Sequence, residues 1–199
     1  MAGIQIDGVN NKIDFDDDLD TSISANTDDT LVIEAGGNTM ATITATTLTI
    51  NDGTTITTAD NTDNLTLKST DTDANIGPNL RLYRAVAGAA SDAIGTIDWA
   101  AQDVAGNLQD YASAAVTITD ATDGSEDATL TLKVMNAGAL NQMLTISGPE
   151  TVVNEGSKDH DFRVESNGNT HMLFVDGGND HINIGGSSDA GGLLNVFGK

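Results

Sequence analysis

Apolar and polar residues alternate in short runs along most of this chain, and turn residues separate the runs. In the middle of the chain the pattern recurs in five runs, 80–84, 94–99, 114–119, 128–134 and 142–146. A period of two puts one face of a strand on a core and the other face in water. No helical period of 3.6 residues persists beyond a few residues. The pattern therefore predicts an all-β fold of short antiparallel strands and hairpin repeats.

Large apolar side chains are scarce. Aromatic residues make up 4% of the 199 residues, and the single Trp and both Tyr (Trp99, Tyr83, Tyr111) fall within 77–148. Such a chain fills a thick globular core poorly, and sharing the core among subunits is one remedy. We therefore expect residues 77–148 to form a central sandwich-like or barrel-like antiparallel β domain within a trimer.

Residues 1–76 contain an internal repeat. Leu31-Val32-Ile33, Leu48-Thr49-Ile50 and Leu65-Thr66-Leu67 share an apolar-x-apolar signature at intervals of seventeen residues. One strand, a turn and a return strand account for that length, since strands average about 5–6 residues. The repeat predicts stacked hairpins, including a strand at 64–68. With 14 acidic and two basic residues, this region is also expected to attach the chain to a platform protein or to cations.

Residues 149–199 predict a meander of hairpins. Four runs, 161–165, 171–175, 181–184 and 193–197, alternate with turns rich in Gly, Asn and Asp. A linker is expected at 154–157. The turn glycine Gly168 is expected to have a positive φ, which a β-branched residue tolerates poorly.

Charge and composition exclude several classes of function. A formal net charge of -22 argues against binding nucleic acid, because a polyanion repels phosphate backbones. The chain has no Cys, which excludes disulfide and thiol chemistry, and no run approaches the roughly 20 apolar residues of a membrane span. The first seven residues are typical of a strand start rather than of a signal peptide.

We predict no catalytic residues and no cofactor, because no nucleophile elbow, phosphate loop or Ser/His/Asp arrangement is present. Metal ligands remain as candidates. His160, His171 and His181 stand at or beside strand starts, and a ring of one of them on a threefold axis could hold a metal. Asp16, Asp18 and Asp20 could offer oxygens to Ca²⁺, as could the cluster at 120–127. The simpler interpretation is solvated polar side chains in both cases.

The chain also resembles a known group of proteins. The segments that carry the resemblance are 1–8, 77–127 and 161–170. They are similar to fibre-like and decoration-like virion proteins of tailed bacteriophages from marine and other aquatic hosts. The resemblance covers nearly the whole chain. Its motifs are repetitive and are typical of a kind of β structure rather than of a binding or catalytic site. It implies a homotrimer without catalytic residues.

The leading hypothesis is a non-enzymatic virion structural protein, made in the host bacterial cytoplasm. It would be a trimeric capsid decoration or cement protein, or a short fibre-like appendage, bound to a major capsid or tail protein on the virion surface. The alternative is a tail-fibre adhesin that binds a host surface glycan, which would need exposed aromatics such as Trp99. A lyase or hydrolase on a β scaffold is a third possibility.

Overall fold

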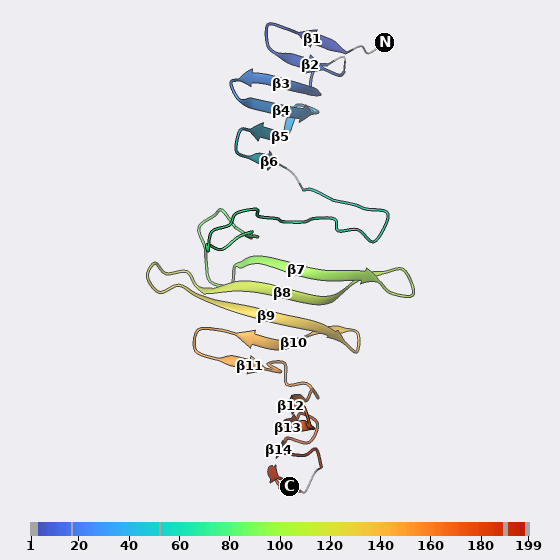
Figure 1. The fold of residues 1–199 in the computed structure, drawn as a ribbon, viewed down its shortest axis with the longest axis vertical. Helices are drawn as coiled ribbons and strands as arrows, with labels where there is room; N and C mark the ends of the chain where they lie inside the picture. The colour runs from blue at the N-terminus through green and yellow to red at the C-terminus, as the bar shows by residue number, and fades with distance from the viewer. Residues whose placement is uncertain (1–3, 17, 52, 189–190, 198–199) are drawn as a thin grey trace. The chain divides into compact units, whose positions relative to one another are not determined.

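The computed structural model describes residues 4–16, 18–51, 53–188 and 191–197, and within them it contains strands and no helix. The all-β prediction is confirmed. The strands form three sheets (Figure 1), and the chain divides into two compact units, Met1–Asn79 and Leu80–Lys199. No helix among the described residues has the length and apolar character that crossing a membrane requires.

The N-terminal unit holds a sheet of six strands paired in chain order, each antiparallel to the next. Its β4–β5 turn uses Gly36 and Gly37 at φ of 56° and 74°, a region that only glycine enters without steric cost. The strands are β1 (Gln5–Asp7), β2 (Lys12–Asp14), β3 (Ser22–Thr27), β4 (Thr30–Ala35), β5 (Asn38–Thr44) and β6 (Leu48–Ile50).

The described residues between β6 and β7 form no strand. The strands predicted at 64–68 and 80–84 are therefore wrong for a single copy of the chain. Residues 53–87 make no backbone–backbone hydrogen bond within the described structure. Some side chains bond to the backbone of this stretch instead: Asn64 Nδ2 donates to the Ile56 carbonyl at 2.8 Å. Residues 85–92 also form no strand, and β7 (Ala93–Gln102) begins directly after them.

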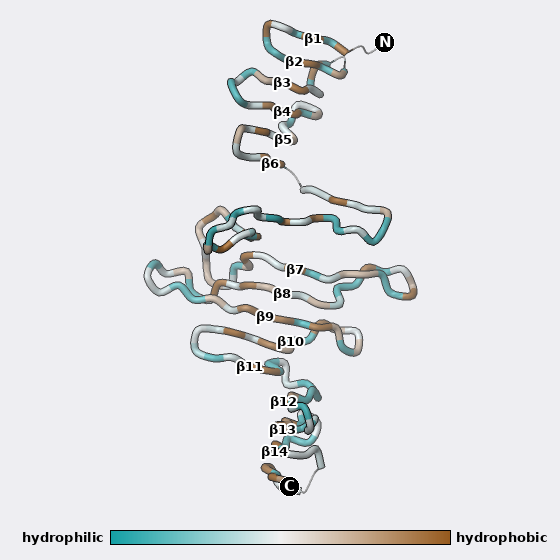
Figure 2. The backbone as a smooth tube through the Cα atoms, viewed as in Figure 1, coloured by the Kyte–Doolittle hydropathy of each residue, from teal (hydrophilic) through white to brown (hydrophobic). Residues whose placement is uncertain are grey.

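The central sheet has five antiparallel strands in the order β11-β10-β9-β8-β7. It is an open single layer in the described residues, so the sandwich-like or barrel-like form expected for this block is not found. It also continues past residue 148, since β11 pairs with β10. The strands are β7 (Ala93–Gln102), β8 (Leu108–Asp120), β9 (Asp127–Asn136), β10 (Ala139–Ile146) and β11 (Thr151–Val153). Hydrophobic residues recur along β9 and β10 (Figure 2).

The C-terminal sheet has the four strands that the meander predicts, in the order β12-β13-β14-β15. The last pairing differs from a meander, because β15 runs parallel to β14. The strands are β12 (Phe162–Ser166), β13 (Asn169–Asp176), β14 (His181–Ile184) and β15 (Leu194–Val196).

The expectation for Gly168 is wrong. Its φ lies outside the left-handed region, and a Cβ added there would meet no atom within 4 Å. Gly177 and Gly185 are the glycines of this sheet that approach backbone most closely: an added Cβ at Gly177 would lie 2.5 Å from the His160 carbonyl oxygen and 2.8 Å from the His160 nitrogen, and one at Gly185 would lie 2.6 Å from the Phe197 carbonyl oxygen. Backbone atoms cannot move aside as a flexible side chain can.

We predict that Gly177→Ala destabilises the folded protein by about 1–3 kcal/mol, the usual cost of overpacking. The matched control, Gly168→Ala, should be neutral or slightly stabilising, because it restricts the unfolded chain without creating a clash. Thermal unfolding at one fixed protein concentration compares the two. Equal melting temperatures would show that the Gly177–His160 approach is not tight.

Candidate interaction surface

Apolar side chains from all six strands of the N-terminal sheet share one of its faces. Cross-strand partners in register lie on the same face of a sheet. The pairing joins one residue of each strand into a single row of Ile6, Ile13, Ile23, Ile33, Ala41 and Ile50. Ile6, Ile13 and Ile50 of this row are exposed (78%, 37% and 46%), whereas Ile23 and Ile33 are half-buried and Ala41 is buried.

The central sheet repeats this arrangement. Its corresponding row is Ile97, Ala114, Leu132, Leu144 and Val153. Trp99 lies on the same face, two residues beyond Ile97, and is 56% exposed. The loop before β7 covers only its margin, where Leu82 contacts Gly95 and Ile118 contacts Gly88.

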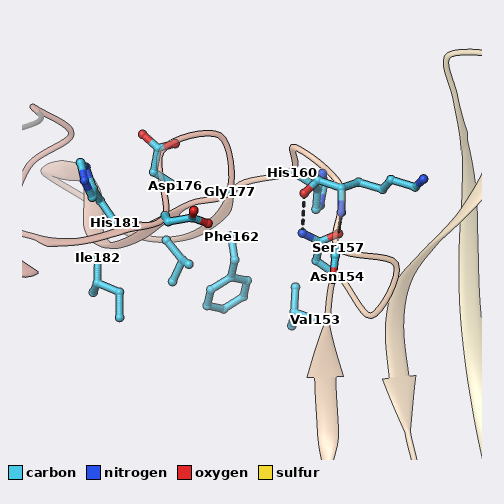
Figure 3. A pocket seen from close by; sticks show the side chains of 12 residues that line it. Val153, Asn154, Ser157, His160, Phe162, Asp176, Gly177, His181 and Ile182 are labelled. Carbon is cyan, nitrogen blue, oxygen red and sulfur yellow. Dashed lines mark hydrogen bonds between the residues drawn. The ribbon is translucent and has the colours of Figure 1, made fainter. Parts of the chain in front are cut away.

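The C-terminal sheet has two such rows. One contains Phe162, Val175, Ile182 and Leu194, and the other contains Val164, Leu173, Ile184 and Val196. A pocket of about 520 Å³ joins the first row to Val153, the last residue of the central row. Figure 3 shows the side chains of Val153, Phe162 and Ile182 pointing to the same side, away from His181 and Asp176. The apolar surface therefore continues from the central sheet to the C-terminal sheet.

The opposite, polar faces of the two end sheets are covered by the chain's own loops. Asp14 and Ser22 are buried in the N-terminal sheet. Lys12 Nζ lies 2.7 Å from Asp14 Oδ1 and donates to the Leu19 carbonyl at 2.8 Å, and the Ser22 hydroxyl donates to Glu34 Oε2 at 2.9 Å. The bond from Lys12 to the Leu19 carbonyl ties Leu19, which follows β2, to the polar face.

In the C-terminal sheet a pair of asparagines lies on the polar face. Asn183 and Asn195 are neighbours across the parallel pair β14–β15, and both are buried. Asn195 Nδ2 donates to Asn183 Oδ1 at 2.8 Å and to the Gly192 carbonyl at 3.0 Å. Sequence reasoning missed this pair. The available signal was the repeat of Ile182-Asn183-Ile184 as Leu194-Asn195-Val196, twelve residues later.

A single copy consequently has almost no apolar core. Among the described residues, the buried hydrophobic side chains are Ala41 and Phe174. One copy exposes 14654 Å², whereas a compact monomer of this mass exposes roughly 8,900 Å². The excess is larger than the about 800 Å² that each partner contributes to a standard interface. The apolar faces are therefore the candidate functional surface of this chain.

The three histidine candidates do not form a ligand cluster. His160 and His181 line the pocket beside Val153, while His171 and His160 line a second hollow of about 430 Å³. His171 packs edge to face on Phe174, with ring centroids 5.1 Å apart, and its Nδ1 lies 2.9 Å from the Thr170 hydroxyl. The spacing of ten and eleven residues does not bring the three rings together.

Asp16, Asp18 and Asp20 do come together. Each offers a carboxylate oxygen within 4.8 Å of the others, and no other group of three such ligands is found in the described part of the chain. The loop partly desolvates Asp20, and the charges of Asp18 and Asp16 add to this in raising the pKa of Asp20. Hydrogen bonds from Thr21 lower the pKa of Asp16. The cluster is a candidate for Ca²⁺, although exposed acidic groups are common without an ion.

Other acidic residues stabilise turns. At Asp7, Asp103, Asp120 and Asp176, one carboxylate oxygen accepts the backbone N–H two residues ahead at 2.8–3.1 Å. Glu126 also bonds to its own loop, but backward: its Oε1 accepts the N–H of Gly124, two residues before it, at 3.1 Å. The acidic cluster at 120–127 thus supplies bonds to its own loop. The overlooked sequence signal is Asp followed three residues later by Asn, in 7–10 and 176–179.

No family model matches the chain, and comparisons with curated proteins and with solved structures also find no match. The functional argument therefore rests on the surfaces described above.

We predict that Asp176 titrates below the ordinary Asp pKa of 3.8. The cause is first the Asn179 side chain, which donates to Oδ2 at 3.1 Å, and then the N–H groups of Asn179 and Gly178. A lowered pKa means that this stabilisation is complete above pH 3.8 and is lost as the pH falls through the lowered value.

Carboxyl-carbon NMR titration measures this midpoint. Asn179→Ala should move the pKa of Asp176 back toward 3.8 and leave the midpoint of Asp7, in the other unit, unchanged. An Asp176 midpoint at or above 3.8 in the unsubstituted protein contradicts the prediction.

Proposed function

We propose that this chain is a non-enzymatic structural subunit of a bacteriophage particle, assembled as a homotrimer. The observation that carries the proposal is the exposed apolar face on each of the three sheets. A face of this size is typical of an obligate subunit interface. A second copy of the chain is a suitable partner for this face, because every copy has the same exposed apolar rows and the same small buried core. The resemblance to fibre-like and decoration-like virion proteins favours three copies.

The position of Trp99 disfavours the adhesin alternative. Sugar stacking needs an aromatic face open to solvent in the assembled protein. Trp99 lies on the apolar face of the central sheet, beside the row that includes Ile97 and Leu132. Covering that face in an assembly would remove Trp99 from glycan binding. Tyr83, 78% exposed on the loop before β7, lies away from this row.

The acidic side chains suit the solvent side of such an assembly. The carboxylates of Asp7, Asp103 and Asp120 bond to turns outside the apolar rows. Charge that stays out of the interface keeps a many-copy surface protein soluble without opposing its association. The 14 acidic residues of the region 1–76 also give it a surface that complements a basic site on a capsid or tail protein.

Leu132→Asp is predicted to dissociate the assembly, because it would bury an unpaired carboxylate in the subunit interface. The matched control is Thr131→Asp, which changes the neighbouring residue on the opposite face of β9 and should leave the assembly intact. Sedimentation equilibrium at micromolar concentration distinguishes a species of three 20.5 kDa chains from the monomer. A monomeric unsubstituted protein would overturn the proposal.

The copy number per particle tests the role in the virion. We expect the protein on purified particles in multiples of three, at hundreds of copies for a capsid decoration and at a few tens or fewer for a tail or vertex appendage. Quantitative mass spectrometry of particles gives this count. Raising the salt should release the protein if the acidic region 1–76 holds it, because salt screens exposed charges. Absence from particles would refute the structural role.

A further inference from the structure

The tetrapeptide Leu-Thr-Leu-Lys occurs twice in this chain, at 65–68 and at 130–133. In β9 the second copy is a strand paired on both sides, with Thr131 opposite Ala115 in β8 and Thr145 in β10. The first copy is in no strand. The same local sequence is therefore a strand where a neighbouring backbone is present and an unpaired segment where none is.

In the copy at 65–68 the backbone is unpaired, and both leucine side chains are exposed to solvent. It belongs to the stretch 53–87, which makes no backbone–backbone hydrogen bond within the described structure. Backbone N–H and C=O groups are obligatory hydrogen-bonding groups, and in folded proteins they bond to other backbone, to side chains or to water. Leu65 and Leu67 are 62% and 44% exposed and lie two residues apart, as on one face of a strand.

We propose that residues 65–68 form a strand whose backbone partner is a second copy of this chain. This inference rests on the homo-oligomer proposed above. The identical sequence in β9 shows that these four residues accept pairing from this protein's own strands. Leu80, Leu82 and Arg84 form a separate alternating run in the same unpaired stretch, but Arg84 is already bound within its own copy. Its guanidinium bonds to Asp92 at 3.1 Å and to the Ala93 carbonyl at 3.2 Å.

A second copy is a more suitable partner than a chain of other chemistry. Leu-Thr-Leu pairs with Thr- and Ala-rich strands of this protein in the central sheet. Two sheets of the same chain also end in unpaired edges, β6 and β7, on either side of this stretch in the sequence. The ten residues of β7 form an open edge of a kind that favours pairing with another chain, and a homo-oligomer supplies one such edge for each copy of the segment.

Residue-resolved hydrogen exchange on the full-length protein tests the inference. Each rate is divided by that of the same sequence unfolded. We expect the amides of 65–68 to exchange at least about 100-fold more slowly than in the unfolded chain, as paired strand amides do. The amides of 130–133, with the same four residues, are the protected reference. The polar residues 71–75 are the unprotected reference.

Sedimentation of the same sample separates the two proposals. An oligomer in which residues 65–68 exchange as fast as 71–75 overturns the strand inference and leaves the homo-oligomer standing. A monomer with free exchange at 65–68 overturns both. An oligomer in which 65–68 is protected like 130–133 supports both, and dilution to the monomer should then remove the protection from 65–68.

Discussion

Each sheet of this protein has one or two rows of apolar side chains on one face, and in a single copy these rows are largely exposed or half-buried. The rows through Ile13, Leu132 and Ile182 have a period of two because strands place alternate residues on opposite faces. A one-layer sheet cannot bury such a row by itself, and the stable solutions pack it against a second layer. The chain's own loops cover the polar faces instead. In the homo-oligomer proposed above, folding and assembly would be coupled, and the stability of one copy would depend on the concentration of the others.

The two faces have different physical roles. Hydrogen bonds on the polar face fix geometry, as where Asn183 Oδ1 accepts from Asn195 and holds β14 and β15 in parallel register. The apolar face supplies the nondirectional attraction, which grows with the area removed from water. A buried amide is costly when its partner is absent, so this pair favours one register over its alternatives. Such specificity is valuable where a repetitive sequence of Ile, Leu and Thr could pair in several ways.

Alternation predicted the all-β class and most of the strands, because it reports how side chains divide between core and water. It could not predict whether a backbone partner exists, so 64–68 was assigned to a strand that a single copy does not form. Nor could it predict the parallel pairing of β15, because apolar and polar residues alternate in the same way in parallel and antiparallel strands. Among the candidate ligands, alternate residues of one short loop brought Asp16, Asp18 and Asp20 together. The histidines come from separate elements, and a regular spacing in sequence did not place them side by side.

The acidity of the chain is compatible with tight association because of where the carboxylates lie. Asp7, Asp103, Asp120 and Asp176 stand at turns, where each accepts backbone N–H groups and so stabilises its own loop. These bonds lower their pKa values and keep them ionised. The apolar rows, in contrast, contain no ionisable residue. With a net charge of -22, the acidic loops of neighbouring copies would repel one another, whereas the apolar rows carry no charge. That separation restricts association to the apolar faces and opposes the indiscriminate stacking to which open sheets are prone.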